Sequence, residues 1–251
     1  MARATQTEHA SERARLVARL AWMDEGTRHF DAQVARLGDH ELGGPAALPR
    51  WTRSHVVAHV ARNADGLGNL LTWARTGVET QMYESAEQRE ADIEEGATQS
   101  GEVLRFDLDD AERRLALATT SLPPDAWWAE VRTRAGRVIL AAEVPWMRSR
   151  EVWVHAVDLD TGASFADLPR AFVDAFLDEL SADFTARPDT GAIELVTTDG
   201  DAHWSIGPHG SDEVTVQGAA HELLAWLLGR ETGAGLTSSA RDGLPALPAW
   251  L

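Results

Sequence analysis

Residues 16–159 carry four long helical patterns, and these constrain the fold more than any other feature of the chain. Apolar residues recur at steps of three and four in residues 16–37, about 54–76, about 103–122 and about 142–159. This spacing is typical of amphipathic helices that bury one face. A polar stretch at residues 79–100 lacks the pattern and links the second helix to the third. Four helices with one long crossover predict a four-helix bundle.

Capping residues mark the ends of these helices. Thr52 and Ser54 are both suitable N-caps for the second helix, and Gly77 should close it. Gly38 should end the first helix, and a Gly- and Pro-rich loop is expected at residues 39–50.

The pattern changes after the fourth helix. Three short strands and two helices are expected there: strands at 193–198 (IELVTT), 203–207 (HWSIG) and 213–218 (EVTVQG), and helices at 169–186 and 219–230. The sequence therefore predicts an α+β fold with two domains. Residues 1–163 would form the helical bundle, and residues 164–251 a small α+β domain.

Composition excludes several classes of function. The chain has 23 basic and 40 acidic residues, a formal net charge of −17, so we expect no binding to nucleic acid and no attraction to acidic lipid. Every basic residue is an arginine, which excludes a lysine Schiff base. The chain has no cysteine, which excludes disulfides, thiolate-bound zinc and a cysteine nucleophile. An anionic substrate would have to be bound by arginine.

The N-terminal stretch MARATQTEHASERARL lacks the apolar core of a signal peptide. No apolar run is long enough to cross a bilayer. We therefore expect a cytoplasmic protein that works without a membrane.

The segment REVWVHAVDL holds the candidate metal ligands. Glu151 and His155 lie four residues apart, on one face of the fourth helix, where two donors can hold one ion. The second helix offers His55 or His59 as a third ligand. Imidazole and carboxylate donors favour zinc or a similar divalent ion. The alternative is a surface hydrogen bond between Glu151 and His155 without a metal. Asp158 could orient an imidazole, or it could be a surface charge.

Three segments carry a resemblance to the mycothiol-dependent maleylpyruvate isomerase family. They are WTRSHVVAHVARNADGLGNLLTWARTGVETQMY, WMRSREVWVHAVDL and LTSSARDGLPALPAWL. The resemblance implies a DinB-like metal-binding bundle followed by a sterol-carrier-like α+β domain. It also implies a zinc ion on His59, Glu151 and His155, and an essential arginine at Arg230 in the segment LLGRETG.

The resemblance further implies the reaction, which belongs to gentisate-type aromatic degradation. Mycothiol, activated by zinc, would add reversibly to the double bond of maleylpyruvate and release fumarylpyruvate. Arg230 would hold a carboxylate of this dicarboxylate substrate or the developing enolate. One alternative is a thiol S-transferase with the same metal site. The other is a non-catalytic protein that binds an apolar ligand in its second domain, where an arginine such as Arg230 would have little use.

Overall fold

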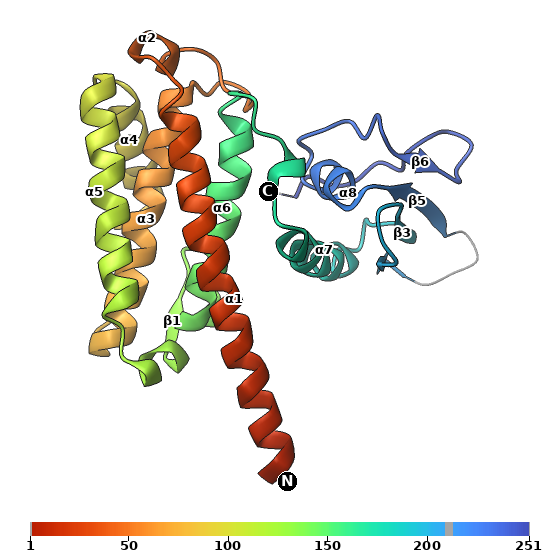
Figure 1. Cartoon of the computed structure of the whole chain (residues 1–251), viewed down its shortest axis with the longest axis horizontal. Coiled ribbons are helices and arrows are strands. Elements are labelled where there is room, and N and C mark those ends of the chain that lie inside the picture. Colours follow the sequence, from red (N-terminus) through yellow and green to blue (C-terminus); the bar gives the residue numbers. More distant parts are fainter. Residues whose placement is uncertain (1, 209–212, 251) are drawn as a thin grey trace. The chain divides into compact units, whose positions relative to one another are not determined.

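The computed structural model describes residues 2–208 and 213–250, and the chain divides into two units, Met1–Ala163 and Ser164–Leu251. The first unit is helical apart from one short hairpin. Its helices are α1 (Ala2–Val34), α2 (Asp39–Leu42), α3 (Arg53–Thr76), α4 (Ala86–Ala97), α5 (Gly101–Thr120) and α6 (Val144–Asp158). Figure 1 shows α1, α3, α5 and α6 running side by side.

The hairpin precedes α6 in the chain. Strands β1 (Glu130–Arg132) and β2 (Val138–Leu140) pair antiparallel, with Val131 opposite Ile139. Two short 3-10 helices flank it, η1 (Pro124–Trp128) and η2 (Ala141–Glu143).

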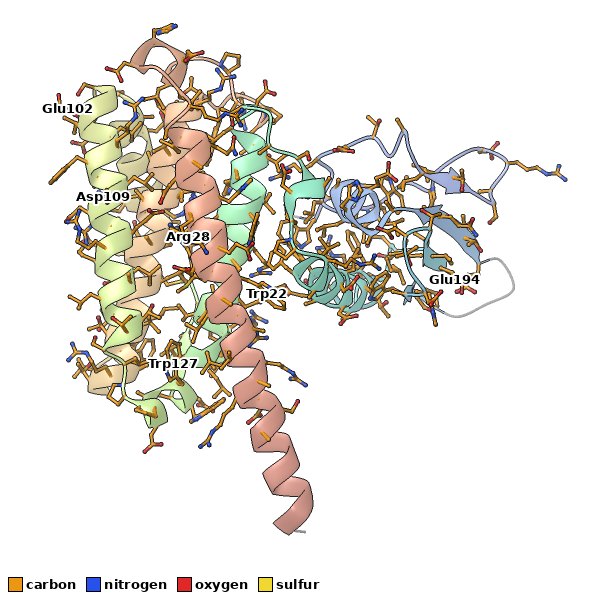
Figure 2. All side chains as sticks on the ribbon, in the orientation of Figure 1. Trp22, Arg28, Glu102, Asp109, Trp127 and Glu194 are labelled. Carbon is orange, nitrogen blue, oxygen red and sulfur yellow. The ribbon has the colours of Figure 1, made fainter. Side chains whose placement is uncertain are left out.

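Helix α3 occupies the centre of the first unit. It packs against α4, α5 and α6, while α1 packs along α6. Its residues Val57, Val60, Leu67 and Leu70 are fully buried, because neighbouring helices cover it on several sides. Figure 2 shows the contrast with α5, where Glu102 and Asp109 lie on an exposed face. A helix covered this way is held rigidly, which suits a carrier of functional side chains.

The ends of α3 agree with the sequence prediction. Thr52 is the N-cap, and its hydroxyl accepts a hydrogen bond from the backbone of His55. Gly77 is the C-cap with a left-handed φ of 72°, a conformation that glycine adopts without the strain of a side chain.

Two connecting segments contain helices that were not predicted. Residues 79–100 connect α3 to α5, as the expected polar crossover does, but they also contain α4. Gly38 was expected to end the first helix; instead α1 ends at Val34, and Gly38 is the N-cap of α2 inside the expected loop. Each of these two helices buries a single apolar side chain, Ile93 in α4 and Leu42 in α2, so neither produces an apolar stripe in the sequence.

The second unit combines two helices with a four-stranded sheet. It contains η3 (Phe165–Asp167), α7 (Arg170–Thr185), β3 (Ile193–Thr197), β4 (His203–Ile206), β5 (Val214–Gly218), α8 (Ala220–Leu227) and β6 (Thr237–Ser238). The strand order is β4-β3-β5-β6, with β3 parallel to β5 and the other pairs antiparallel. The α+β fold class is confirmed; β6 was not predicted.

Apolar side chains from α7, α8 and the sheet form the core of the second unit. Helix α7 packs on α8 and on β4, and α8 packs on β5. The buried residues include Phe172, Phe176, Leu195, Val216 and Leu224. Among the described residues of both units, no helix is long and apolar enough to cross a membrane.

Candidate metal centre

Helices α3 and α6 bring His59, Glu151 and His155 together. His59 Nε2 lies 2.8 Å from Glu151 Oε2, and His155 Nε2 lies 3.3 Å from the same oxygen. The two imidazole rings meet edge to face, with centroids 4.6 Å apart. One donor atom from each residue lies within 4.8 Å of the other two. Residues 92 positions apart in the chain thus converge on one point.

The donor set and its orientation fit a divalent metal. Two imidazole nitrogens and one carboxylate oxygen form a three-ligand set that catalytic zinc uses, with a fourth position open to water or substrate. His155 Nδ1 donates to Asp158 Oδ2 at 2.9 Å, which directs Nε2 of the ring toward the other donors. Asp158 is fully buried, so its alternative interpretation as a surface charge is wrong.

The electrostatics of the triad favour a positive charge at its centre. Burial raises the pKa of Glu151, but hydrogen bonds from His155 and His59 outweigh it and hold that pKa well below its usual range. Burial lowers the pKa of His155, but its bonds to Asp158 and Glu151 raise it to about 9. For His59 burial dominates and lowers the pKa. The half-buried carboxylate of Glu151 and the buried carboxylate of Asp158 therefore stabilise a cation here, whether a proton or a metal ion.

The other histidine of α3, His55, lies outside this cluster. The backbone N–H of Thr52 donates to His55 Nδ1 at 3.2 Å, and the Thr52 hydroxyl lies 2.6 Å from the same nitrogen. His55 Nε2 lies 3.3 Å from Glu94 Oε2 on α4. Thus Nδ1 of His55 contacts the N-cap of α3, and Nε2 contacts α4. Of the two candidates, only His59 shares the cluster with Glu151 and His155.

A fully buried arginine fixes α3 against α6 close to the triad. Arg148, one turn before Glu151, donates to the carbonyl of Val60 at 2.7 Å and to Asn63 Oδ1 at 3.0 Å. It also donates to Glu112 Oε1 on α5 at 2.7 Å. Because Val60 follows His59 directly, these bonds set the register of His59 relative to Glu151.

Two residues beside the triad were not predicted from the sequence. Arg89 on α4 donates from Nη2 to His59 Nδ1 at 2.8 Å. Its guanidinium carbon lies 5.6 Å from the ring centre of Tyr83. Tyr83 lies against Gly66 of α3, where an added Cβ would approach the ring to 2.9 Å. The signal available in the sequence was the only tyrosine of the chain, six residues before an arginine.

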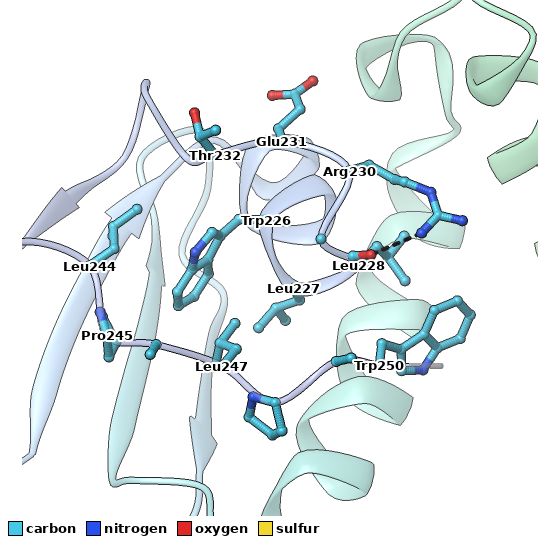
Figure 3. Close-up of a pocket in the computed structure, with 14 residues that line it drawn as sticks. Trp226, Leu227, Leu228, Arg230, Glu231, Thr232, Leu244, Pro245, Leu247 and Trp250 are labelled. Atoms are coloured by element: carbon cyan, nitrogen blue, oxygen red, sulfur yellow. Dashed lines mark hydrogen bonds between the residues drawn. The ribbon is translucent and has the colours of Figure 1, made fainter. Parts of the chain in front are cut away.

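Arg230 lies in the second unit, just beyond α8. Its backbone N–H donates to Ala225, and its Nη1 donates to the carbonyl of Leu228 at 3.2 Å. Arg230 lines a cavity of about 510 Å³, and Trp226 and Trp250 are also among its lining residues. Figure 3 shows these side chains. The structure therefore places the predicted arginine on a cavity wall in its own unit.

Two family models match the chain. One, described as the mycothiol maleylpyruvate isomerase N-terminal domain, matches residues 23–160, and the MDMPI C-terminal domain matches residues 167–249. No curated protein sequence gives a match.

Two solved structures are similar over nearly the whole chain. One is a mycothiol-dependent maleylpyruvate isomerase, at 38% identity and a TM-score of 0.88; the other is a mutant of such an enzyme with one histidine replaced by alanine, at 38% identity and a TM-score of 0.87. Each match covers 94% of this chain and 97% of the other. Both domain models and this identity lead to one conclusion: the chain belongs to the mycothiol-dependent maleylpyruvate isomerase family.

Proposed function

We propose that the protein isomerises maleylpyruvate to fumarylpyruvate with mycothiol as a catalytic thiol and zinc as the metal. The observation that carries the proposal is the convergence of His59, Glu151 and His155 on one point in a chain of this family. The chain has no cysteine of its own, so the nucleophilic sulfur must come from a diffusible thiol. The activity would belong to the degradation of gentisate-type aromatic compounds.

Cis–trans isomerisation requires the double bond to become single for a moment. The thiolate sulfur forms a bond to an alkene carbon, and the alkene electron pair moves through the conjugated carbonyl to its oxygen, giving an enolate. The carbon–carbon bond that was the double bond is now single, and the molecule rotates about it. The enolate then restores the double bond and expels the thiolate, so the thiol is regenerated and no oxidant or reductant is consumed.

The residues of the chain prepare this reaction. His59, Glu151 and His155 would hold the zinc ion, which when bound lowers the pKa of a thiol so that it reacts as thiolate. Asp158 keeps the Nδ1 proton on His155 and thereby orients its Nε2. Arg148 holds α3 in register with α6 through the carbonyl of Val60. These contacts keep the donor atoms in place and reduce the reorganisation that metal binding requires.

Arg230 is our proposal for a carboxylate-binding group in the second unit. It lines the cavity beside Trp226 and Trp250, and its planar guanidinium can form two parallel hydrogen bonds with a carboxylate. This role is consistent with a dianionic substrate in a chain whose net charge is −17.

The decisive experiment is a titration of mycothiol against the rate of maleylpyruvate loss, with the product and the thiol both quantified. We expect no turnover without thiol, saturation with mycothiol, and fumarylpyruvate as product while the thiol concentration stays constant. Full activity in thiol-free buffer would refute the proposal. Stoichiometric loss of the thiol into a stable adduct would establish an S-transferase instead.

A further inference from the structure

The hydrogen bond between Arg89 and His59 conflicts with metal binding. A guanidinium carries only N–H donors, so His59 Nδ1 accepts the bond from Arg89 Nη2 with its lone pair. The proton of the neutral ring then lies on Nε2, which donates to Glu151 Oε2 at 2.8 Å. A metal ion on Nε2 needs the lone pair of that atom, so the ring proton must move to Nδ1. Two N–H groups would then face each other at the Arg89 contact.

The other histidine of the triad has the Nδ1 partner that a metal requires. His155 donates its Nδ1 proton to the carboxylate of Asp158, so a metal ion can bind its Nε2 without any change at Nδ1. Metal ligands of this kind pair with acceptors, and Arg89 is a donor. Metal binding through His59 must therefore displace Arg89.

The displaced guanidinium would remain beside the triad, and its N–H groups could donate hydrogen bonds to a ligand. The Arg89 side chain is only 12% exposed, and its Nε is buried without a hydrogen-bond partner among the described residues. The Tyr83 ring lies 5.6 Å away and provides a face for the cation. Arg89 also pairs with the carboxylate of Glu90, which is 64% exposed, and such a pair is weak and readily exchanged. Nε and Nη2 together form the edge that binds a carboxylate through two hydrogen bonds.

We propose that Arg89 is a metal-controlled carboxylate-binding residue: metal on His59 releases its guanidinium from the ring, and the released guanidinium binds a carboxylate of the substrate. This inference rests on the proposed function, because maleylpyruvate supplies the carboxylates. It deepens that function by making substrate binding depend on metal loading, so that the protein binds the dicarboxylate strongly only when the thiol-activating metal is in place.

Zinc affinity tests the first half of the proposal. Zinc binding is measured by competition with a chelator for the full chain, for Arg89→Met and Arg89→Gln, and for the control Arg114→Met. Arg114 is an ion-paired arginine of α5 whose partners are Asp65 and Asp110. We expect both Arg89 variants to bind zinc about tenfold more tightly. Neither variant has the guanidinium that holds His59 in the tautomer with its proton on Nε2. A role in supporting the fold would weaken zinc binding, and unchanged or weaker binding in both variants would overturn the proposal.

Binding of maleate, a simple cis-dicarboxylate, tests the second half. With zinc-loaded proteins in a calorimeter, Arg89→Met should bind maleate about tenfold more weakly than the unaltered chain or Arg114→Met. Arg89→Gln should show the same loss, since its amide cannot replace a guanidinium fork. Equal maleate affinity in all zinc-loaded proteins would overturn the proposal.

The binding and turnover experiments together distinguish a failure of this inference from a failure of the proposed function. If the unaltered chain isomerises maleylpyruvate but the Arg89 variants behave like Arg114→Met in both binding experiments, only the inference fails. If the Arg89 variants show the expected zinc and maleate affinities but the unaltered chain does not isomerise maleylpyruvate with mycothiol, the inference on Arg89 holds and the proposed reaction fails.

Discussion

Asp158 lies outside the candidate metal triad but contacts one of its members, His155. Asp158 is buried and accepts a hydrogen bond from His155 Nδ1. Asp160, two positions further on, is exposed and lies near Arg53. The two aspartates are therefore a matched pair. One hydrogen-bonds with a candidate metal ligand, and the other lies at the surface beyond the end of α6.

We predict that Asp158→Asn weakens zinc binding by about 10- to 100-fold, since an amide holds the His155 tautomer less firmly than a carboxylate does. Asp160→Asn should leave zinc affinity unchanged. Competition with a chelator measures both constants. Equal affinities in the two variants would show that the bond between Asp158 and His155 does not orient a ligand.

Arg230 carries a second prediction at this scale. Arg230→Ala should retain zinc and fold but lose about a hundredfold or more in turnover of maleylpyruvate, as expected when a group that stabilises anionic charge is removed. Arg170→Ala is the control, because Arg170 forms ion pairs with Asp174 on α7 and with Asp199 in the turn between β3 and β4. Near-normal turnover in Arg230→Ala would assign the carboxylate to another arginine.

At the scale of helices, one buried polar cluster joins four elements of the first unit. Arg148 on α6 binds groups on α3 and on α5, and Glu112 on α5 hydrogen-bonds with Asp31 on α1. Burial is the main cause that raises the pKa of Glu112 to about 8; Arg148 opposes this shift, and Asp31 adds to it. The carboxyl group of Glu112 is thus held largely neutral at neutral pH, in spite of its arginine partner.

The raised pKa of Glu112 makes the stability of the bundle depend on pH. A carboxyl whose pKa is higher in the folded than in the unfolded state stabilises the fold fully below its unfolded pKa of about 4.5, and this contribution is lost as the pH rises toward 8. Glu112→Gln mimics the neutral form. The variant should match the unaltered chain near pH 5 and exceed it in free energy of unfolding near pH 8, by on the order of 3 kcal/mol.

Denaturant unfolding at several pH values measures this difference. Glu102→Gln, on the exposed face of the same helix, should show no pH-dependent difference from the unaltered chain. A difference for Glu112→Gln that stays constant from pH 5 to pH 8 would contradict the neutral state of Glu112.

The long helices and the Glu151–His155 pair could be predicted from the sequence because both depend on local periodicity. Apolar stripes define helices, and a spacing of four puts two donors on one face. Choosing His59 over His55 required the family resemblance, since both lie on α3 and only their tertiary surroundings differ. Helix α4 was missed because its single buried apolar residue, Ile93, produces no stripe. Arg148 and Arg89 reach their partners through contacts between helices, which local patterns do not encode.

At the scale of the whole molecule, the two units carry different chemical groups. The first holds the candidate metal ligands on α3 and α6, and the second holds Arg230 on the wall of its cavity. The family models match each unit separately, at residues 23–160 and 167–249. We predict that zinc binding depends on residues of the first unit alone.

The central claim is that activity depends on one metal ion held by His59, Glu151 and His155. The most direct test strips the protein of metal and measures mycothiol-dependent isomerisation of maleylpyruvate while zinc is added back. We predict that activity rises linearly and stops at about one equivalent per chain, that His59→Ala shows no such rise, and that His55→Ala follows the unaltered chain. Full activity in the stripped protein, or an identical titration for His59→Ala, would contradict the account.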